Sequence, residues 1–289
     1  MKRRDTPTIG FIGAGTTGIA LAVRLAQHGY QVIAVSSRSL TSAEKLAGGI
    51  SGCQFYNGAQ EVADIAQLVF ITTPDGIIPE VAAEVQWRKN QSVVHCSGAD
   101  SVDILEPARQ RETNTGCFHP LQTFASVDQA IDNIPGSTFA IEAEEPLLSV
   151  LKEMATALEG DWVTLKAGDK VLYHAAAVFA CNYLVTLVKL ATDLWQTFGV
   201  SPAQATKALM PLLRGTLSNI ENVGLPNCLT GPIARGDLGT ISRHLESLEG
   251  RAPPLLNIYK ELGRQTIPIS LAKGKIDLQR AEELQALLR

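Results

Sequence analysis

Three glycines near the start of the chain have the spacing needed to receive a phosphate group. Gly13, Gly15 and Gly18 follow the pattern G-x-G-x-x-G. In this pattern the first glycine permits a tight turn, the second lets the backbone approach a diphosphate, and the third lets a helix pack closely on a sheet. Thr16 and Thr17 fall inside the motif and are predicted to bind the same group, at the helix N-terminus. The alternative is a tight strand-to-helix turn that binds no ligand.

The residues about 20 positions further on distinguish two nicotinamide cofactors. An NAD site usually has Asp or Glu there, but this chain has Ser36, Ser37 and Arg38. A carboxylate would repel a 2′-phosphate, whereas a guanidinium group and hydroxyls can hold one. The pattern therefore predicts NADP as the cofactor. The alternative is that Arg38 is a solvated loop residue.

Three polar residues are predicted to be catalytic, because hydride transfer to a carbonyl or imine needs a proton donor, or a base in the reverse direction. Lys170 and His174 are spaced i, i+4 on a predicted helix, so both project from one face. His119 precedes Pro120, which keeps His119 out of the α region in an extended conformation. His95 ends a strand at the same sheet edge and ranks below these three, since its ring can face inward.

Each catalytic candidate also has a structural alternative. Lys170 could be a solvated lysine of the first helical turn, and His174 a histidine hydrogen-bonded within the core. His119 could be a turn histidine that bonds the backbone. The sequence leaves these alternatives open.

Two further residues are predicted to bind the substrate. Arg235 stands among small residues in the segment 230–237, and its guanidinium group suits a carboxylate. Asn182 lies on the helix predicted for Lys170, turned about 80° from His174 at 3.6 residues per turn. Asp237 is more simply explained as the N-cap of the next helix.

Strands and helices alternate over the first 165 residues, which predicts a doubly wound parallel sheet of the Rossmann type. We expect strands at 9–12, 32–35, 68–72, 92–96, 115–118, 138–141 and 162–165, and helices between them that include one capped by Thr41. Thr73, Pro74 and Ser97 follow two of the strands, at the carboxyl ends where open α/β sheets bind ligands. These three residues complete the predicted cofactor site.

The pattern changes at Gly168, where long apolar-periodic segments replace the strands. We expect helices at about 169–198, 202–221, 237–248, 253–264 and 276–288. The predicted domains are a dinucleotide-binding Rossmann domain at 1–166 and a helical substrate and dimerisation domain at 167–289. Residues 171–188 contain no charged side chain, and we expect a helix buried among other helices or at a subunit contact rather than a membrane span.

Composition excludes several classes of protein. The chain has 289 residues, 19% of them charged and 45% hydrophobic, as in soluble globular proteins. A net charge of −4 without a long basic run gives no sign of nucleic-acid binding. The five cysteines are widely spaced without a C-x-x-C pattern, so we expect no disulfide framework, no metal site and a reducing, cytoplasmic setting.

Several stretches resemble one superfamily. They are GFIGAGTTG (10–18), TTPDGII (72–78), HCSGA (95–99), GCFHPLQTF (116–124), KVLYHAAAVFACNYL (170–184) and LTGPIARGD (229–237). Together they look like the 6-phosphogluconate-dehydrogenase-like superfamily, most closely its uncharacterised Rossmann-like NADP oxidoreductases with a C-terminal helical domain of unknown function. The resemblance implies dimerisation through the helical domain.

Two residue roles are implied by that resemblance. The FHP segment is similar to the His-Pro segment of prephenate dehydrogenases, in which the histidine meets the substrate hydroxyl, and His119 matches it. β-Hydroxyacid dehydrogenases and ketopantoate reductases carry a lysine with an asparagine four residues later. Lys170 matches the lysine, but His174 replaces the asparagine.

We therefore predict an NADP(H)-dependent oxidoreductase that transfers hydride between the nicotinamide and a small oxo acid, hydroxy acid or imine. One alternative is a non-catalytic NADP(H)-binding sensor or assembly protein. Another is an enzyme that reduces NADP with a deazaflavin cofactor.

Overall fold

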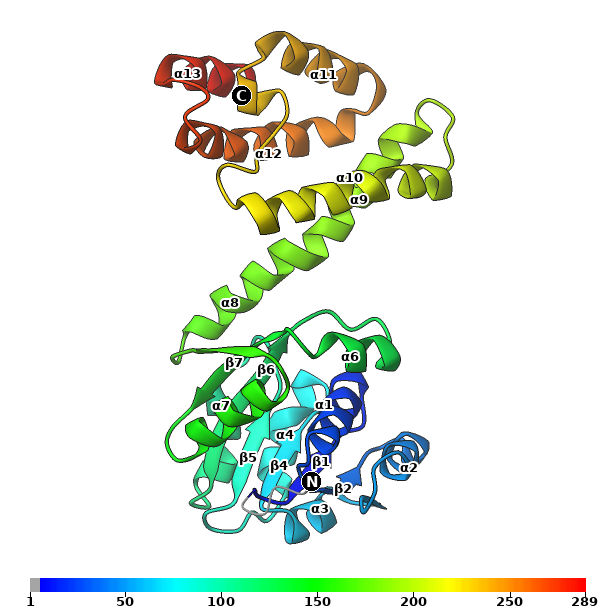
Figure 1. Ribbon diagram of the computed structural model, residues 1–289, viewed down its shortest axis with the longest axis vertical. Coiled ribbons are helices and arrows are strands. Elements are labelled where there is room, and N and C mark those ends of the chain that lie inside the picture. The colour runs from blue at the N-terminus through cyan, green and yellow to red at the C-terminus, as the bar shows by residue number, and fades with distance from the viewer. Residues whose placement is uncertain (1–5) are drawn as a thin grey trace. The chain divides into compact units, whose positions relative to one another are not determined.

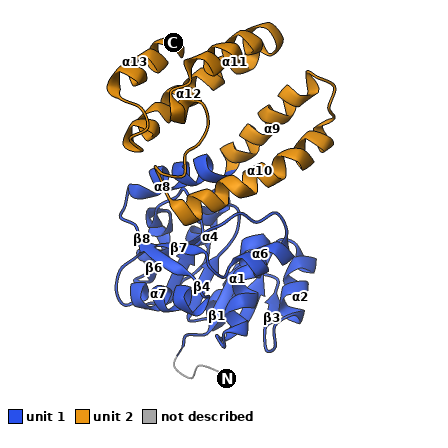
Figure 2. Cartoon of the chain, turned by 45° about the horizontal axis from the view of Figure 1, so that its top comes forward, with its two compact units in different colours: residues 1–181 blue, residues 182–289 orange. Residues whose placement is uncertain are grey.

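The computed structural model describes residues 6–289, and the chain divides into two compact units between residues 181 and 182. Figure 2 shows the two units in different colours. The division falls inside a helical stretch that runs from Asp169 to Gln196. The predicted domain boundary at 166/167 stays a prediction.

The first unit is built on one eight-stranded sheet. Its strands are β1 (Ile9–Ile12), β2 (Val32–Ser36), β3 (Gln54–Tyr56), β4 (Leu68–Ile71), β5 (Ser92–His95), β6 (Asn114–Leu121), β7 (Thr138–Ala143) and β8 (Asp161–Thr164). They lie in the order β3-β2-β1-β4-β5-β6-β7-β8, and every neighbouring pair is parallel except β6 and β7. The predicted doubly wound Rossmann sheet is confirmed, with one antiparallel pair added.

Helices cover both faces of this sheet (Figure 1). They are α1 (Thr16–Gln27), α2 (Leu40–Gly48), α3 (Ala59–Ile65), α4 (Ile78–Glu84), α5 (Glu106–Arg109), α6 (Val127–Asn133) and α7 (Leu147–Ala157), with short 3₁₀ segments η1 (Asp75–Ile77) and η2 (Val102–Leu105). A further helix, α8 (Asp169–Ala177), follows β8 and extends away from the sheet (Figure 1). One buried apolar cluster joins α1, α2, α6 and α7 to the sheet, and a second joins α3, α4 and α5. Each face therefore has its own core.

The structure departs from the predicted elements at several places. The short strand β3 was not predicted, because it has only three residues and forms by pairing with β2. The seven-residue helix α6 was not predicted either. The N-cap of α2 is Ser39, whose hydroxyl accepts from the Ser42 amide, rather than Thr41. β6 continues through His119 and Pro120, since antiparallel pairing with β7 extends it beyond the predicted 115–118.

A row of phenylalanines forms the centre of the first core. Phe11, Phe70, Phe118 and Phe139 are fully buried on β1, β4, β6 and β7. Successive ring centroids are 5.1, 6.1 and 4.5 Å apart, and the first and last pairs are stacked. These contacts add to the burial of apolar area and hold the middle strands of the sheet in register.

The second unit is helical. It comprises α9 (Tyr183–Gln196), α10 (Pro202–Val223), the 3₁₀ turn η4 (Ile233–Arg235), α11 (Leu238–Arg251), α12 (Pro253–Ala272) and α13 (Leu278–Leu287), and the π-helical segment η3 (Val178–Asn182) joins α8 to α9. Ile241, Ile267 and Leu284 form the small core of the last three helices. Pro202 begins α10 as predicted, and Asp237 caps α11 by accepting from the Thr240 amide.

The apolar helix 169–196 is exposed rather than buried. Val171 and Val185 are each 68% exposed, and the most apolar 18-residue window of this helix contains no buried residue. The expectation of a helix buried among other helices of the chain is therefore wrong. By length and composition alone this helix would also cross a membrane, which is weak support for a span.

The phenylalanine row predicts a large loss of stability on truncation. We expect Phe70→Ala to lower the free energy of unfolding by about 3–5 kcal/mol, because it removes ring contacts with Phe11 and Phe118 and leaves a cavity. Phe55→Ala, on the exposed edge strand β3, is the control and should change stability by less than about 1 kcal/mol. Urea titration followed by circular dichroism measures both, and equal losses would contradict the prediction.

Candidate active site

The loop between β1 and α1 packs against the end of β4 through two glycines. Gly13 has a φ of +113°, and a Cβ there would lie 2.6 Å from the Thr72 carbonyl carbon. A Cβ on Gly18 would lie 2.5 Å from Thr72 Oγ1, which donates to the Gly13 carbonyl at 2.8 Å. Both positions therefore require glycine. Gly15 differs, because among the described residues its only neighbour within 4 Å of such a Cβ is the Thr72 carbonyl oxygen.

Gly15 is also the N-cap of α1, and the first amides of this helix are open to an anion. Within residues 6–289 no side chain caps this end, and the first turn holds no acidic residue. Thr16 and Thr17 occupy that turn and are partly exposed. An accessible backbone beside an uncapped helix N-terminus fits a diphosphate.

A cleft of about 530 Å³ opens beside this loop. The predicted cofactor residues Gly13, Gly15, Ser36, Ser37, Arg38, Thr73 and Pro74 line it. Ser39, which follows Arg38 directly in sequence, also lines it, as do residues that the sequence did not indicate, namely Ser42, Asn57, Glu80 and Glu84 among others. The strand ends of β1, β2 and β4 thus meet at one cleft, as the parallel sheet requires.

The end of the cleft at β2 is rich in donors. Arg38 is exposed, and the hydroxyls of Ser39 and Ser42 lie 2.9 Å apart beside it in sequence. Thr73 Oγ1 is buried without a hydrogen-bond partner in the described part of the chain, so a bound polar ligand would satisfy it. The cleft therefore fits a ligand that carries phosphate groups.

The sheet order places a second group of side chains further along the same edge. β1, β4, β5 and β6 are neighbours, so the glycine loop, Thr73, Ser97 and His119 follow one another along it. Neighbouring strands are about 4.8 Å apart. Because His95 pairs with Cys117, His119 lies two residues beyond the end of β5. Ser97 does not line the cleft described above but belongs to this second group.

Lys170 is the buried centre of this group. The side chain lies in the first turn of α8 and is 1% exposed. Its Nζ atom donates to the Ser97 carbonyl oxygen at 2.5 Å and to Cys117 Sγ at 2.9 Å. The alternative of a solvated lysine is therefore wrong. Burial raises the pKa of the Cys117 thiol to about 11, so the sulfur accepts as a neutral group.

His119 is bonded to the same helix. Its Nδ1 atom lies 2.8 Å from the Tyr173 hydroxyl, one helical turn beyond Lys170. The pKa of His119 is lowered to about 3, first by burial, then by the charge of Lys170 and by His174. The ring is therefore neutral at pH 7. Its partner is a side chain rather than the backbone, and its place is a strand rather than a turn.

His174 faces the same point as His119. A Cβ on Gly98 would lie 2.8 Å from His119 Nε2 and 2.8 Å from His174 Nδ1. Any side chain at residue 98 would displace both rings. His174 is exposed, so the alternative of a core histidine is wrong.

His95 lies beneath the group. It is fully buried, and its Nδ1 atom accepts from the Ser97 amide at 3.2 Å. Burial first, then the charges of Lys170 and His119, lower its pKa to about 3. A neutral ring that faces inward is consistent with ranking His95 below the other three catalytic candidates.

The structure thus brings Lys170, His174 and His119 together, and it adds Cys117, Gly98 and Tyr173, which sequence reasoning missed. Cys117 precedes His119 by two residues on a strand and so shares its face, and Tyr173 follows Lys170 by three on a helix. Those spacings were usable signals. For Gly98 nothing in the spacing indicated the role.

Asn182 and Arg235 belong to the second unit, and their substrate role stays a prediction. Arg235 is exposed and lines a hollow of about 250 Å³ with Lys275 and Arg280.

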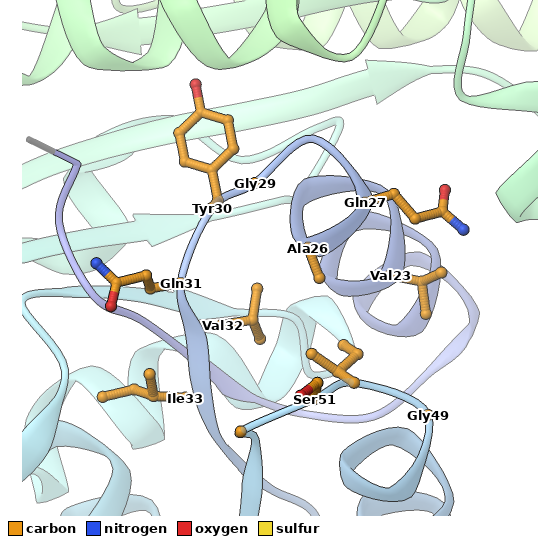
Figure 3. A pocket seen from close by; sticks show the side chains of 12 residues that line it. Val23, Ala26, Gln27, Gly29, Tyr30, Gln31, Val32, Ile33, Gly49 and Ser51 are labelled. Carbon is orange, nitrogen blue, oxygen red and sulfur yellow. The ribbon is translucent and has the colours of Figure 1, made fainter. Parts of the chain in front are cut away.

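A separate hollow of about 420 Å³ lies at the opposite end of β2 (Figure 3). Tyr30, Gln31 and Ser51 are among its lining residues, and none of the described residues that line it is charged. It offers no group for acid–base chemistry.

Comparison with known families matches both parts of the chain. Residues 2–122 match the Rossmann-like domain, and residues 137–266 match the domain of unknown function DUF2520. The two matches together span most of the chain.

Of three known proteins that resemble this chain in sequence or structure, two are named as a dehydrogenase or an oxidoreductase. A glycerol-3-phosphate dehydrogenase [NAD(P)+] of Neisseria meningitidis is 24% identical, over 92% of this chain and 80% of its own. The inferred NADP oxidoreductase BF3122 of Bacteroides fragilis is 26% identical with a TM-score of 0.70, covering 91% of this chain and 98% of its own. Protein TM1727 of Thermotoga maritima is 24% identical with a TM-score of 0.74, covering 92% and 99%.

The buried charge predicts a titration shift. We expect Lys170→Met to raise the pKa of His119, because it removes the second-largest cause of the lowering. The pKa should stay below its usual 6.5, since burial remains the largest cause. Imidazole signals followed by NMR against pH measure this. Lys166→Met, at an exposed site, is the control, and an unchanged His119 pKa in Lys170→Met would contradict the prediction.

Proposed function

The chain belongs to the family that joins a Rossmann-like domain to a C-terminal DUF2520 domain, and from that premise we propose that it is an NADP(H)-dependent oxidoreductase of small oxo or hydroxy acids. The observation that carries the proposal is the buried Lys170 ammonium group beside His119, on the sheet edge that also bears the glycine loop. This polar cluster favours catalysis over a non-catalytic sensor.

NADP is the cofactor that the cleft fits. Gly15 and the first turn of α1 would hold the diphosphate, and Ser37, Arg38 and Ser39 would hold the 2′-phosphate. Thr73 and Pro74 would contact the part of the cofactor nearer β5. Relatives named for NAD(P)+ and NADP support this assignment.

When bound, the nicotinamide supplies or accepts the hydride. Lys170 stabilises the negative charge that develops on the substrate oxygen and donates a proton to it, or holds the hydroxyl in the reverse direction. His119, which stays neutral, donates a hydrogen bond without competing as a cation. His174 lies at the exposed side of the group, from which a substrate would enter.

The charge of the site favours an oxo acid over an imine. Reduction of an imine proceeds through a cationic iminium group, which the Lys170 ammonium would repel. A carbonyl with a neighbouring carboxylate is attracted to the same ammonium group instead. A small 2-oxo acid such as ketopantoate is the first substrate to test.

We also propose a homodimer formed through the helical unit. α9 and α10 expose large apolar side chains that a soluble chain seldom leaves uncovered, including Val185 at 68% and Leu212 at 66%. A second copy of the helical unit would cover them. All five cysteines are free thiols, which supports a reducing, cytoplasmic setting.

Arg38 should decide the choice of cofactor. We expect Arg38→Ala to weaken NADPH binding about tenfold or more and to leave NADH binding unchanged, since a hydrogen bond to a charged group contributes roughly 1.5–3 kcal/mol. Fluorescence titration with both cofactors measures this. Arg24→Ala, on α1, is a control that should leave both affinities unchanged. Failure of the wild-type protein to bind either cofactor, or a preference for NADH, would overturn the cofactor assignment.

Lys170 should be needed for turnover. We expect NADPH oxidation with 2-oxo acids in preference to cyclic imines, and a fall in kcat of about 10²–10⁴-fold in Lys170→Met, because a positioned acid is lost. Lys166→Met should retain full activity. Background rates across the panel, or equal rates in the two variants, would refute the mechanism.

The exposed helices should carry the dimer contact. We expect the double variant Val185→Glu/Leu212→Glu to be monomeric, because burying two carboxylates in the dimer contact would cost more free energy than the remaining apolar contacts provide. Lys207→Glu, an exposed charge reversal on α10, should stay dimeric. Light scattering during size-exclusion chromatography measures the mass, and a monomeric wild-type protein would contradict the proposal.

A further inference from the structure

Tyr173 contacts the candidate site through its hydroxyl group and its ring. Its hydroxyl lies 2.8 Å from His119 Nδ1, and the two rings meet edge to face, with centroids 5.6 Å apart and planes at 90°. Within residues 6–289 no other hydrogen bond of that hydroxyl is seen. The centroid of the Tyr173 ring also lies 5.9 Å from Lys170 Nζ, so the tyrosine is close to both the lysine and the histidine.

Both members of the pair are neutral. Burial, ahead of the charge of Lys170, keeps the pKa of His119 near 3. Burial, ahead of the neighbouring Cys117, raises the pKa of Tyr173 well above its usual range. One proton therefore remains on the phenol, and one remains on either Nδ1 or Nε2 of the imidazole.

The chemistry of the two groups decides which of them donates. A phenol O–H is a stronger acid than the N–H of a neutral imidazole, and an unprotonated imidazole nitrogen is a stronger acceptor than a phenol oxygen. The O–H···N arrangement is therefore more stable than N–H···O at the same distance. It places the proton of His119 on Nε2.

The Nε2 atom faces the place where residue 98 has no side chain. A Cβ on Gly98 would come within 2.8 Å of this nitrogen. Because residue 98 is a glycine, no side chain of that residue blocks access to Nε2 from that side. His119 is only partly buried, so a ligand can reach the ring.

We propose that Tyr173 is a positioning residue that donates its hydroxyl hydrogen to His119 Nδ1, holds the neutral ring in the Nε2–H form, and thereby directs an N–H donor at an electronegative atom of the substrate. The direction of the donor toward a substrate rests on the proposed function. The tautomer itself does not, because it belongs to the free protein.

The test is ¹⁵N NMR of the imidazole nitrogens in the free protein, with the His119 signals assigned by their loss in His119→Gln. The wild-type protein should show a protonated Nε2 and an unprotonated, hydrogen-bonded Nδ1. In Tyr173→Phe the Nδ1 resonance should move toward that of a free imidazole nitrogen, since the variant keeps the ring and loses only the hydroxyl. With an oxo acid and NADPH, kcat should fall on the order of tenfold, the scale seen when the partner that orients a metal-ligating histidine is removed.

The chain contains a matched control. Tyr259 bonds His244 Nδ1 at 2.8 Å in the second unit, with the ring planes at 82°. Tyr259→Phe should move the Nδ1 resonance of His244 and leave the His119 signals and kcat unchanged.

Two outcomes would overturn the proposal. The first is a wild-type His119 that carries its proton on Nδ1, and the second is an Nδ1 resonance that Tyr173→Phe leaves in place. If the tautomer is as proposed and Tyr173→Phe retains wild-type kcat, the role toward the substrate is wrong. Absence of turnover in the wild-type protein would count against the proposed function and not against the tautomer.

Discussion

A lysine ammonium group that solvent barely reaches constrains the arrangement of the first unit. Leaving such a group unpaired in a low-dielectric interior is costly, so acceptors must be brought to it. The Ser97 carbonyl and the Cys117 sulfur do this, from the end of β5 and from β6. The first turn of α8 must therefore place Lys170 over the ends of these two strands. The left-handed Gly168, with a φ of +91°, makes the turn that starts the helix there.

That charge also sets the state of the side chains around it. Burial and the Lys170 ammonium group together keep His119 and His95 uncharged. The group therefore combines one fixed cation with neutral donors, a combination suited to polarising a carbonyl and holding an anion. The cation and the glycine loop lie on the same sheet edge, three strands apart, because the order β1-β4-β5-β6 places the strand ends in series.

Elements with strong local signals could be predicted. The strand at 9–12, the glycine loop and the helix closed by His28 follow from an apolar run, three glycines and a helical period, all of which are local. β3 and the extension of β6 could not be predicted, because both exist through pairing with a neighbouring strand. The exposure of the apolar helix 169–196 could not be predicted either, since an apolar sequence is compatible with a core, a subunit contact or a membrane.

The sequence by itself determined which groups were available: a glycine loop, a Ser-Ser-Arg strand end, and Lys170 four residues before His174. Only the tertiary structure decided that His119 joins them and that Tyr173 and Gly98 complete the group. The reason is distance along the chain. The contact between His119 and Tyr173 spans 54 residues, and it arises because the start of α8 packs over the end of β6. No spacing within a single element encodes that contact.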